Sequence, residues 1–447
     1  MKFLGCKVSQ ADAMLARRQL LEAGHEEAPE ADAELHVINT CCITGEAEAK
    51  SRQSVRRSLK SARQVFVGGC AANLRPPQFA EIDPAVKVFT GTAEDVASAM
   101  ASTQPRPRRI TGGCVDSEHD LLIRQPGHRA PNTWSGSRTR GFVKVQDGCD
   151  CHCAYCIIPT VRGSARSRAA SAVLREVELR AAQHQREIVI TGISVGDYRD
   201  AQSGLDLGEL LVAAARVPGV ERVRVSSIEV IHVTASLIAA LRDEPKVCPH
   251  LHVPLQSGDD AVLAAMGRHY TAAEYLATIQ ALRERVPGVN VTTDVIVGFP
   301  NEDRAAFEQT LELVKTAHIS RAHTFQYSSR PGTVAEALGD RISPDEKKRR
   351  SQEMRGLSEV RSRLHRTRKL GRTERVLVDK VAETRCAGYS ADYTRCYLPA
   401  GAATAGELLD ATVEELQADG VLVTPRPRSR MAAGTRFSAS RPAAARR

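Results

Sequence analysis

The feature that most constrains the fold is a succession of six strand-like segments between residues 142 and 327, each followed by a helical pattern. They recur every ~30–45 residues, as consecutive βα units do. The segments are FVKVQ at 142, EIVIT at 187, VRVSSI at 223, LHVPL at 251, VTTDVIVG at 291 and AHTFQY at 322. A closed parallel barrel takes eight such units, so six predict an α/β fold with a partial (βα)6 barrel. Its chemistry would lie at the carboxyl ends of the strands.

A smaller α/β unit is predicted in residues 1–103. Three strand-like runs, KFLG, LHVIN and VFVGG, lead into Cys6, Cys41 and Cys70, and Ser9 is the candidate cap of the first helix. Because the carboxyl ends of parallel strands share one rim, the three cysteines could meet there. A shared metal site is therefore credible, whereas a lone cysteine is more often a small buried hydrophobe.

The rest of the chain divides into three regions that differ in amino-acid composition and in the pattern of apolar residues. Residues 104–134 are rich in proline, glycine and charge, typical of a linker before the barrel domain at 135–365. In residues 366–425, short alternating segments predict a small antiparallel β-barrel. Residues 426–447 contain arginines but no acidic residue and predict a disordered basic tail.

Composition limits the class of protein. No apolar run approaches the ~20 residues that span a bilayer, and no signal peptide precedes Cys6, so we expect a cytoplasmic protein without a membrane partner. Thiols stay reduced in that compartment, so twelve cysteines suggest metal binding more than disulfides. The net charge of +9 is a weak indication of nucleic acid. A basic helix is predicted after the cap Ser343, ending near Gly371; its charges could be a solvated surface or an RNA-binding one.

The stretch GCDCHCAYCIIP places four cysteines and a histidine within eight residues. A zinc ion would take any four of them in tetrahedral geometry, although zinc sites usually draw on paired CxxC elements from two loops. These candidate ligands are Cys149, Cys151, His152, Cys153 and Cys156. Alternatively, the spacing CxxxCxxC lets Cys149, Cys153 and Cys156 hold three corners of a 4Fe–4S cluster, with one iron left open. An open position on a metal is the mark of a catalytic centre.

This CxxxCxxC motif, with Tyr155 before its last cysteine, resembles the signature of the radical S-adenosylmethionine (SAM) superfamily. In that superfamily the amino and carboxylate groups of SAM chelate the open iron. The resemblance makes Cys151 and His152 spacers.

Further stretches are similar to the methylthiotransferase family within that superfamily. In the barrel these are FVKVQDGC, CIIPTVRGSARSR, EIVITGISVGDY, VRVSSIEV, PHLHVPLQSGDDAVLAAMGRHYT, TTDVIVGFP and QYSSRPGT. LGCKVSQAD, INTCCITGEAEAKSRQ and GGCAAN resemble the family's N-terminal domain, and GYSADYTRCYLP its RNA-binding TRAM domain. The resemblance extends from Leu4 to about Thr424. QDGCDCHCAYCIIP and KVCPHLHVPLQSG are most similar to the branch that acts on N6-threonylcarbamoyladenosine at position 37 of tRNA. The branches that act on isopentenyladenosine in tRNA or on an aspartate of a ribosomal protein share the architecture and stay open.

The resemblance implies two 4Fe–4S clusters. Cys149, Cys153 and Cys156 would hold the cluster that cleaves SAM. An auxiliary cluster, also with an open iron, would be held by Cys6, Cys41 and Cys70. The family pattern NTCxxT aligns Cys41, rather than Cys42, with the ligand. The remaining cysteines match no ligand motif: Cys114, Cys248, Cys386 and Cys396.

SAM would lie across the strand ends. The resemblance places Gly192 against the methionyl amino group, where a glycine allows close backbone approach. Glu229 and Gln256 could hold the ribose or the carboxylate, or make ordinary hydrogen bonds at the barrel mouth. The apolar stretch around Val297 could flank the adenine, beside a loop that has GFPNED where the family commonly has GFPGE.

The implied reaction is radical methylthiolation. An external one-electron reductant such as flavodoxin or ferredoxin would reduce the SAM cluster, and a 5′-deoxyadenosyl radical would abstract hydrogen from C2 of the modified adenine. Sulfur at the auxiliary cluster would couple to C2, and a second SAM would supply the methyl group; the sulfur donor and the order of these steps stay open. The anticodon loop would present the base, and Tyr389, Tyr393 and Arg395 would contact RNA or belong to the small barrel's core.

Two interpretations from other classes stay open. An iron–sulfur electron carrier would need neither SAM nor the β-barrel, and a non-catalytic RNA-binding redox sensor would not turn over SAM. Formation of 5′-deoxyadenosine by reduced protein separates both from the enzyme.

Overall fold

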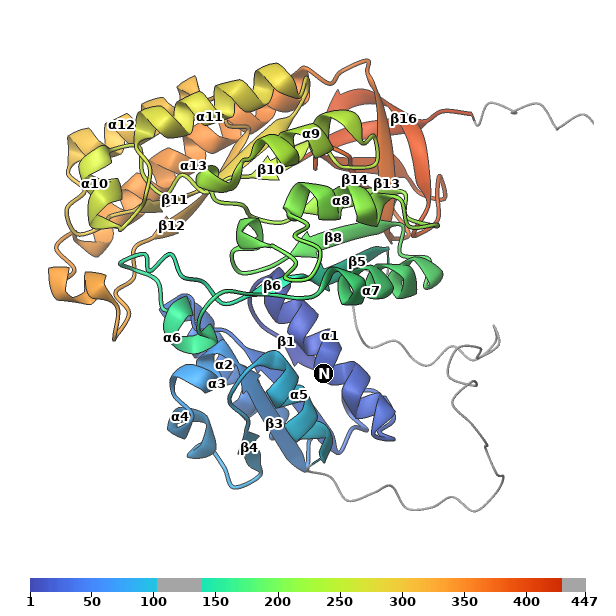
Figure 1. The fold of residues 1–447 in the computed structure, drawn as a ribbon, viewed down its shortest axis with the longest axis vertical. Helices are drawn as coiled ribbons and strands as arrows, with labels where there is room; N and C mark the ends of the chain where they lie inside the picture. Colours follow the sequence, from blue (N-terminus) through green and yellow to red (C-terminus); the bar gives the residue numbers. More distant parts are fainter. Residues whose placement is uncertain (103–138, 428–447) are drawn as a thin grey trace, which may run out of the picture.

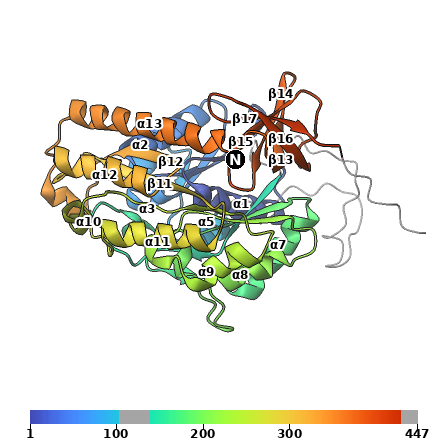
Figure 2. The ribbon, with the colours of Figure 1, turned by 90° about the horizontal axis from the view of Figure 1, so that it is seen from above.

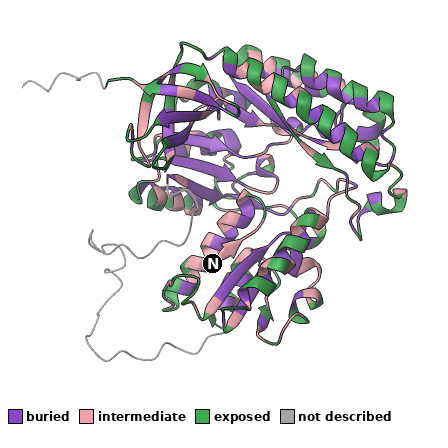
Figure 3. Ribbon diagram, turned by 180° about the vertical axis from the view of Figure 1, so that it is seen from behind, coloured by how far each residue is buried: buried purple, intermediate pink, exposed green. Residues whose placement is uncertain are grey.

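The computed structural model describes residues 1–102 and 139–427 and confirms the mixed α/β fold. An N-terminal sheet, a larger partial barrel and a small closed β-barrel follow one another along the chain (Figure 1). The sheets are mostly buried, and the outer helix faces are exposed (Figure 3). The predicted linker with Cys114, and the predicted tail beyond residue 427, lie outside the described residues.

The N-terminal part is a parallel sheet between two layers of helices. Its strands, in spatial order, are β1 (Lys2–Phe3), β2 (Leu35–Thr40), β3 (Gln64–Gly69) and β4 (Val86–Val88). Its helices are α1 (Lys7–Glu22), α2 (Gly45–Ser58), α3 (Cys70–Leu74), α4 (Pro77–Ala80) and α5 (Ala93–Ser102). Helices α1 and α5 share one hydrophobic cluster with the sheet, while α2 and α3 share another on the opposite face. Strand β4 escaped prediction because three residues carry no periodic signal.

Helix α1 begins earlier than the sequence indicated. Ser9 is buried inside the first turn, and Cys6 takes the N-cap position with an extended backbone and no side-chain cap. Gly5, at a φ of 115°, lets the chain turn from β1 into the helix, a conformation that favours glycine. The expected Ser9 cap was therefore wrong, and Lys7 is the first helical residue, next to Cys6.

The central part is the predicted partial barrel. Its six parallel strands are β5 (Arg140–Lys144), β8 (Glu187–Thr191), β9 (Arg222–Val225), β10 (His250–His252), β11 (Asn290–Val297) and β12 (Arg321–Gln326). They form two three-stranded sheets, joined by the bridges Val223–Val247 and Ser227–His252. The α-helices that follow the strands are α7 (Ala170–Ala182), α8 (Leu207–Ala215), α9 (Ala235–Asp243), α10 (Asp260–Ala265), α11 (Ala272–Arg285), α12 (Arg304–Thr316) and α13 (Pro344–Thr367). No helix of the described residues is long and apolar enough to cross a membrane.

Short elements frame the cysteine loop and the end of the barrel. They are β6 (Gln146–Asp147), α6 (Ile158–Arg162), β7 (Arg166–Ser167) and the 3-10 turns η2 (Val195–Asp197), η3 (Val230–His232) and η4 (Val334–Leu338). The predicted basic helix is α13, whose first turn is capped by the Ser343 side chain. It ends at Thr367, before Gly371.

The C-terminal part is a closed five-stranded barrel. Its strands are β13 (Thr373–Val381), β14 (Arg385–Ser390), β15 (Arg395–Pro399), β16 (Leu408–Leu416) and β17 (Val421–Pro425). All pairings are antiparallel except β15 with β17, which is parallel. Cys386 and Cys396 are fully buried in its core. Figure 2 shows the small barrel at the end of α13, the helix that precedes it in the chain.

A buried ion cluster fastens the small barrel to the strand beginnings of the larger one. Arg222 and Arg224 donate to the Glu187 carboxylate at 3.3 and 3.0 Å. The same guanidinium groups donate to the backbone carbonyls of Tyr389 and Ala391 in the small barrel, at 3.0 and 2.9 Å. Burial alone would raise the pKa of Glu187, but Arg224 and Arg222 outweigh it and lower that pKa to about 2.

Glu187→Gln is expected to lower the free energy of unfolding by about 3–5 kcal/mol at pH 7, because two buried arginines lose their counter-charge. The folded-state pKa lies below the unfolded one, so this stabilisation is present above pH ~4.3 and is lost as the pH falls through about 2. Urea unfolding of both proteins from pH 7 to pH 2 should show their difference shrinking across that window. A difference that stays constant would show that Glu187 is not ionised in the folded protein.

Candidate functional site

A cavity of about 960 Å³ lies along the concave face of the partial barrel. Alternate side chains of its strands line the cavity, since successive residues of a strand point to opposite faces. In β11 and β12 these are Asn290, Thr292, Asp294, Arg321, His323 and Phe325. The cysteine loop and Cys6 line the cavity at the carboxyl ends of the strands, and Tyr389 and Tyr393 line it near the strand beginnings.

The cysteine loop presents all of its cysteines to this cavity. Cys149, Cys151, Cys153 and Cys156 each line it and are half-buried. Gly148 starts the loop at a φ of 72°, and a Cβ there would lie 2.0 Å from the Ser164 carbonyl oxygen. The loop therefore turns where only glycine fits.

Hydrogen-bond donors surround the cysteine sulfurs. The Cys151 backbone N–H donates to Cys149 Sγ at 3.4 Å, and the hydrogen bond from the Cys151 thiol lowers the pKa of Cys149 to about 7. Arg268 Nη1 donates to Cys153 Sγ at 3.2 Å. Burial raises the pKa of Cys156 to about 12. Hydrogen-bond donors of this kind stabilise the negative charge that a cysteine sulfur carries when it binds a metal as a thiolate.

The two metal-site alternatives differ in how the ligands must converge. Within the described residues, no three His, Cys, Asp or Glu side chains converge on a point that could hold one metal ion. This holds for the zinc ligands and for the three-cysteine sets alike, so it does not separate the two alternatives. Three thiols spread along one cavity wall, with hydrogen-bond donors at two of the sulfurs, fit the larger 4Fe–4S cluster.

Four of the five residues expected near SAM line the cavity, namely Tyr155, Gly192, Glu229 and Gln256. Gln256 has a φ of 65°, and its side-chain Oε1 is buried without a hydrogen-bond partner. The Glu229 carboxylate already pairs with Arg268. Gly192 packs against Gln146. If residue 192 carried a side chain, its Cβ would lie only 3.1 Å from Gln146.

The fifth residue, Val297, lies elsewhere. It is fully buried in the barrel's hydrophobic core and does not line the cavity. Val297 is the last residue of β11, and side chains alternate between the two faces of that strand. Val297 therefore lies on the face opposite to Asn290, Thr292 and Asp294, which line the cavity. The structure does not bring Val297 together with the other four.

The second cysteine set meets at the rim of the N-terminal sheet. Cys6 is exposed and lines the large cavity. Cys41 lies against the Gly5–Cys6 turn. If residue 5 carried a side chain, its Cβ would lie only 3.1 Å from Cys41 Sγ. Cys70 is buried at the start of α3. Burial raises the pKa of Cys41 to about 11, and the nearby Cys70 and Cys6 thiolates raise it further. The three cysteines therefore lie near one another at strand ends of one sheet, and their sharing of a metal site stays a prediction.

Cys42 differs from its neighbour Cys41. It is fully buried in a hydrophobic cluster with Ile38 and Val55, and its thiol hydrogen-bonds to Cys70. That hydrogen bond, together with Arg162, lowers the pKa of Cys70 to about 6 despite burial. Cys42 therefore acts as a donor to Cys70 from the protein interior.

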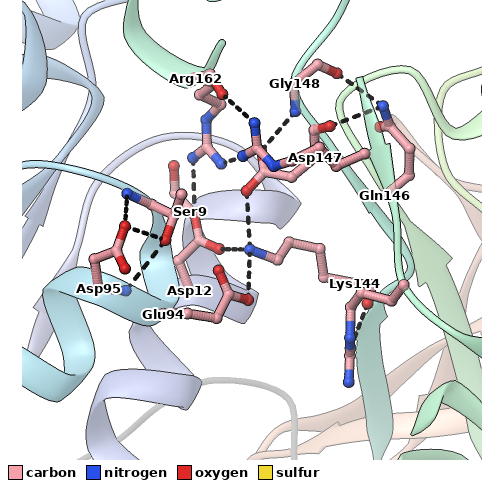
Figure 4. A network of polar contacts seen from close by, with 12 residues as sticks. Ser9, Asp12, Glu94, Asp95, Lys144, Gln146, Asp147, Gly148 and Arg162 are labelled. Atoms are coloured by element: carbon pink, nitrogen blue, oxygen red, sulfur yellow. Dashed lines mark hydrogen bonds and ion pairs between the residues drawn. The ribbon is translucent and has the colours of Figure 1, made fainter. Parts of the chain in front are cut away.

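A buried charge network joins the two cysteine sets (Figure 4). Arg162, in α6 after the cysteine loop, bridges Asp12 of α1 and Asp147 of β6 at 2.8 and 2.9 Å. Lys144 of β5 bridges the same two carboxylates at 2.8 and 3.0 Å. Arg162 Nε also donates to Cys70 Sγ at 3.1 Å. The network therefore fixes the N-terminal sheet, the cysteine loop and the first barrel strand relative to one another.

Sequence reasoning missed the network and Arg268. Arg162 lies within CIIPTVRG, six residues after Cys156, and that position was its one available signal. Arg268, in AAMGRHY, lies 115 residues from the cysteine it contacts. Neither pairing follows from local periodicity.

The aromatic residues of the small barrel do not belong to its core. Tyr389 and Tyr393 stack with ring centroids 4.9 Å apart and line the large cavity with Arg395. The core interpretation was therefore wrong for these two tyrosines, and their contact with RNA stays a prediction. Cys248 is buried, and its backbone N–H donates to the Val223 carbonyl of β9 at 2.8 Å.

Comparison with known proteins agrees with this architecture. Residues 143–314 match the profile of the Radical SAM superfamily, and residues 1–91 that of Uncharacterized protein family UPF0004. The chain is 32% identical to Threonylcarbamoyladenosine tRNA methylthiotransferase MtaB of Thermotoga maritima over 94% of both chains. It is 34% identical to the protein of that name from Bacillus subtilis over 80% of this chain and 79% of the relative.

A relative that is named for another substrate is similar to the same degree. The tRNA-2-methylthio-N(6)-dimethylallyladenosine synthase of Citrifermentans bemidjiense is 33% identical over 85% of this chain and 87% of its own. Among solved structures, the radical S-adenosylmethionine methyltransferase TsrM of Kitasatospora setae superposes with a TM-score of 0.51. It covers 75% of this chain and 71% of its own at 15% identity, which supports the fold alone.

Proposed function

Because this chain belongs to the radical SAM methylthiotransferases of tRNA, we propose that it converts N6-threonylcarbamoyladenosine at position 37 to its 2-methylthio derivative. The observation that carries the substrate is the end-to-end match to the Thermotoga relative of that name, over 94% of both chains. The enzyme uses SAM and 4Fe–4S clusters, as its superfamily does.

We assign the SAM cluster to Cys149, Cys153 and Cys156. When bound there, the cluster would supply the one-electron chemistry that cleaves SAM and so activates an unactivated C–H bond such as C2 of adenine. The chain's own part is to hold and shield this site. Arg268 donates to Cys153 Sγ and pairs with Glu229, so it links the cysteine loop to the barrel wall.

We assign a second cluster, the site of sulfur transfer, to Cys6, Cys41 and Cys70. Cys6 lines the same cavity as the cysteine loop, so a base in that cavity would have access to both sets. Cys42, enclosed in the hydrophobic core, donates a hydrogen bond to Cys70 rather than serving as a ligand.

Gly192, Glu229 and Gln256 are proposed to contact SAM with Tyr155. Their support is that all four line the cavity and that Gln256 Oε1 is buried without a partner, so that atom is free to accept a hydrogen bond from a ligand. Val297 would not touch SAM and would only pack behind the residues that line the cavity.

The tRNA anticodon loop is the proposed partner. Stacked tyrosines and arginines are suited to unstacked bases and phosphates, and Tyr389, Tyr393 and Arg395 line the cavity. We assign residues 1–103 to the cluster-bearing N-terminal domain, 135–365 to the radical SAM domain and 366–425 to the RNA-binding barrel. The enzyme would act in the cytoplasm with an external one-electron reductant.

The test is the modification state of tRNA. Expression in a bacterial strain that lacks its own methylthiotransferases should restore 2-methylthio-N6-threonylcarbamoyladenosine, measured by mass spectrometry of digested tRNA. The second candidate substrate, dimethylallyladenosine, is favoured by the 33% identity to the Citrifermentans relative. Restoration of only the 2-methylthio derivative of that base would refute the threonylcarbamoyl substrate.

A further inference from the structure

Lys7 is a basic residue of the large cavity. It is the first residue of α1 and lines the cavity next to Cys6. Within the described residues its Nζ has no hydrogen bond or ion pair, and it lies over the face of the Tyr393 ring, 5.7 Å from the centroid.

The other cations around Tyr393 already have carboxylate partners. Arg224 lies 4.6 Å from the Tyr393 ring centroid and pairs with Glu187. Arg140 donates to the Tyr393 hydroxyl at 3.4 Å and pairs with Asp379. Lys7 is half-buried, and a charge that loses water is costly unless it is paired, so the position beside Lys7 suits an anion from outside the chain.

Buried polar atoms without partners give independent support for a ligand here. His250 and Ser226 line the same cavity and are each 4% exposed. In the part of the chain that the structure describes, His250 Nδ1 and Ser226 Oγ have no hydrogen-bond partner. The His250 ring lies 5.1 Å from the ring of Tyr393, the tyrosine under Lys7. Buried polar groups are normally satisfied, so these two atoms point to a polar ligand.

The start of α1 adds backbone donors on the same side. Cys6 provides no side-chain cap, and the first-turn N–H groups of a helix attract anions. Cys6, Lys7 and Val8 all line the cavity. Lysine, histidine, serine and free N–H groups together match a substituent that carries a carboxylate and further hydrogen-bonding groups.

We propose that Lys7 is a specificity-determining residue that binds the carboxylate of the threonylcarbamoyl group on the substrate adenine. The inference rests on the proposed function and deepens it. An isopentenyl group offers neither charge nor hydrogen bonds, so it would leave Lys7, His250 and Ser226 unpaired. Sites built to bind a polar group reject analogues that lack it.

An RNA phosphate is the other anion that Lys7 could meet, and binding assays separate the two. The full chain with reconstituted clusters and no reductant would be titrated with three anticodon stem-loop RNAs. Their position 37 carries threonylcarbamoyladenosine, its carboxyl methyl ester, or adenosine. We expect wild type to bind the free acid about tenfold more tightly than the ester, because a charge-assisted hydrogen bond is lost.

Lys7→Met should abolish the preference for the acid over the ester and leave adenosine RNA bound within about twofold. Lys7→Arg, which keeps the charge, should retain most of the preference, and Lys7→Gln gives a second neutral variant if Lys7→Met folds poorly. Lys50→Met is the matched control, since it removes an exposed lysine on α2 that pairs with Glu46, and it should change nothing. Iron content and thermal unfolding verify each variant.

Each contrary result has its own meaning. Equal weakening of all three RNAs by Lys7→Met would assign Lys7 to a phosphate and overturn the inference. Equal binding of acid and ester by wild type would overturn it as well. A preference for the acid that survives Lys7→Met and Lys7→Gln would overturn the role of Lys7 while leaving the substrate intact. Failure of the substrate itself shows separately in the tRNA nucleoside analysis.

Discussion

Cys153→Ser is expected to lower 5′-deoxyadenosine formation by more than about a thousandfold, because the cluster that we assign to Cys149, Cys153 and Cys156 would lose one of its three protein ligands. The measurement is anaerobic incubation of reconstituted protein with dithionite and SAM, followed by chromatography of the nucleosides. Iron content should fall from about eight to about four per chain, since one of two clusters is lost. Arg268 would also lose the sulfur to which it donates at 3.2 Å.

Cys151→Ser is the matched control within the same loop. Its backbone N–H, which donates to Cys149 Sγ at 3.4 Å, is kept, and a serine hydroxyl can replace the thiol as a donor. Activity should stay within about threefold of wild type, as for a substitution worth ~0.5 kcal/mol. If Cys151→Ser loses as much iron as Cys153→Ser, Cys151 is itself an iron ligand and the proposed set of three cysteines is wrong.

The sequence predicted those parts of the fold that local periodicity and spacing encode. All six barrel strands lie where alternating or apolar runs indicated, and the ends of three N-terminal strands bring together Cys6, Cys41 and Cys70. Strand β4 is too short to give such a signal. The start of α1 was misplaced because Ser9 is a common cap, whereas here an extended Cys6 precedes the helix.

The electrostatics of the site could not be predicted in the same way. Arg162 lies 92 residues from Cys70, and Arg268 lies 115 residues from Cys153, so only tertiary folding brings each guanidinium to its sulfur. The unpaired state of Lys7 likewise depends on where Glu187 and Asp379 find their own partners. Charge in a sequence can be counted, but its pairing is a property of the fold.

Arg162→Met is expected to lower the free energy of unfolding by about 3–5 kcal/mol, because the buried carboxylates of Asp12 and Asp147 would share Lys144 alone. It should also weaken the second cysteine set, since Cys70 Sγ loses a donor at 3.1 Å. We expect loss of iron from the N-terminal domain on dilution or mild chelation, while 5′-deoxyadenosine formation persists. Urea unfolding, iron release and nucleoside chromatography measure the three effects.

Arg166→Met is the control for that experiment. Arg166 is exposed in β7, four residues after Arg162, and donates only to the backbone carbonyls of Arg162 and Ser164, so its removal should change stability by no more than ~0.5 kcal/mol. Arg162→Lys tests geometry at constant charge, because an ammonium group lacks the planar fork that reaches two carboxylates and a sulfur together. It should keep part of the stability but release iron faster than wild type. If Arg162→Lys instead matches wild type in both measurements, the charge of residue 162 is sufficient and the hydrogen bond to Cys70 has no role in holding the second cluster.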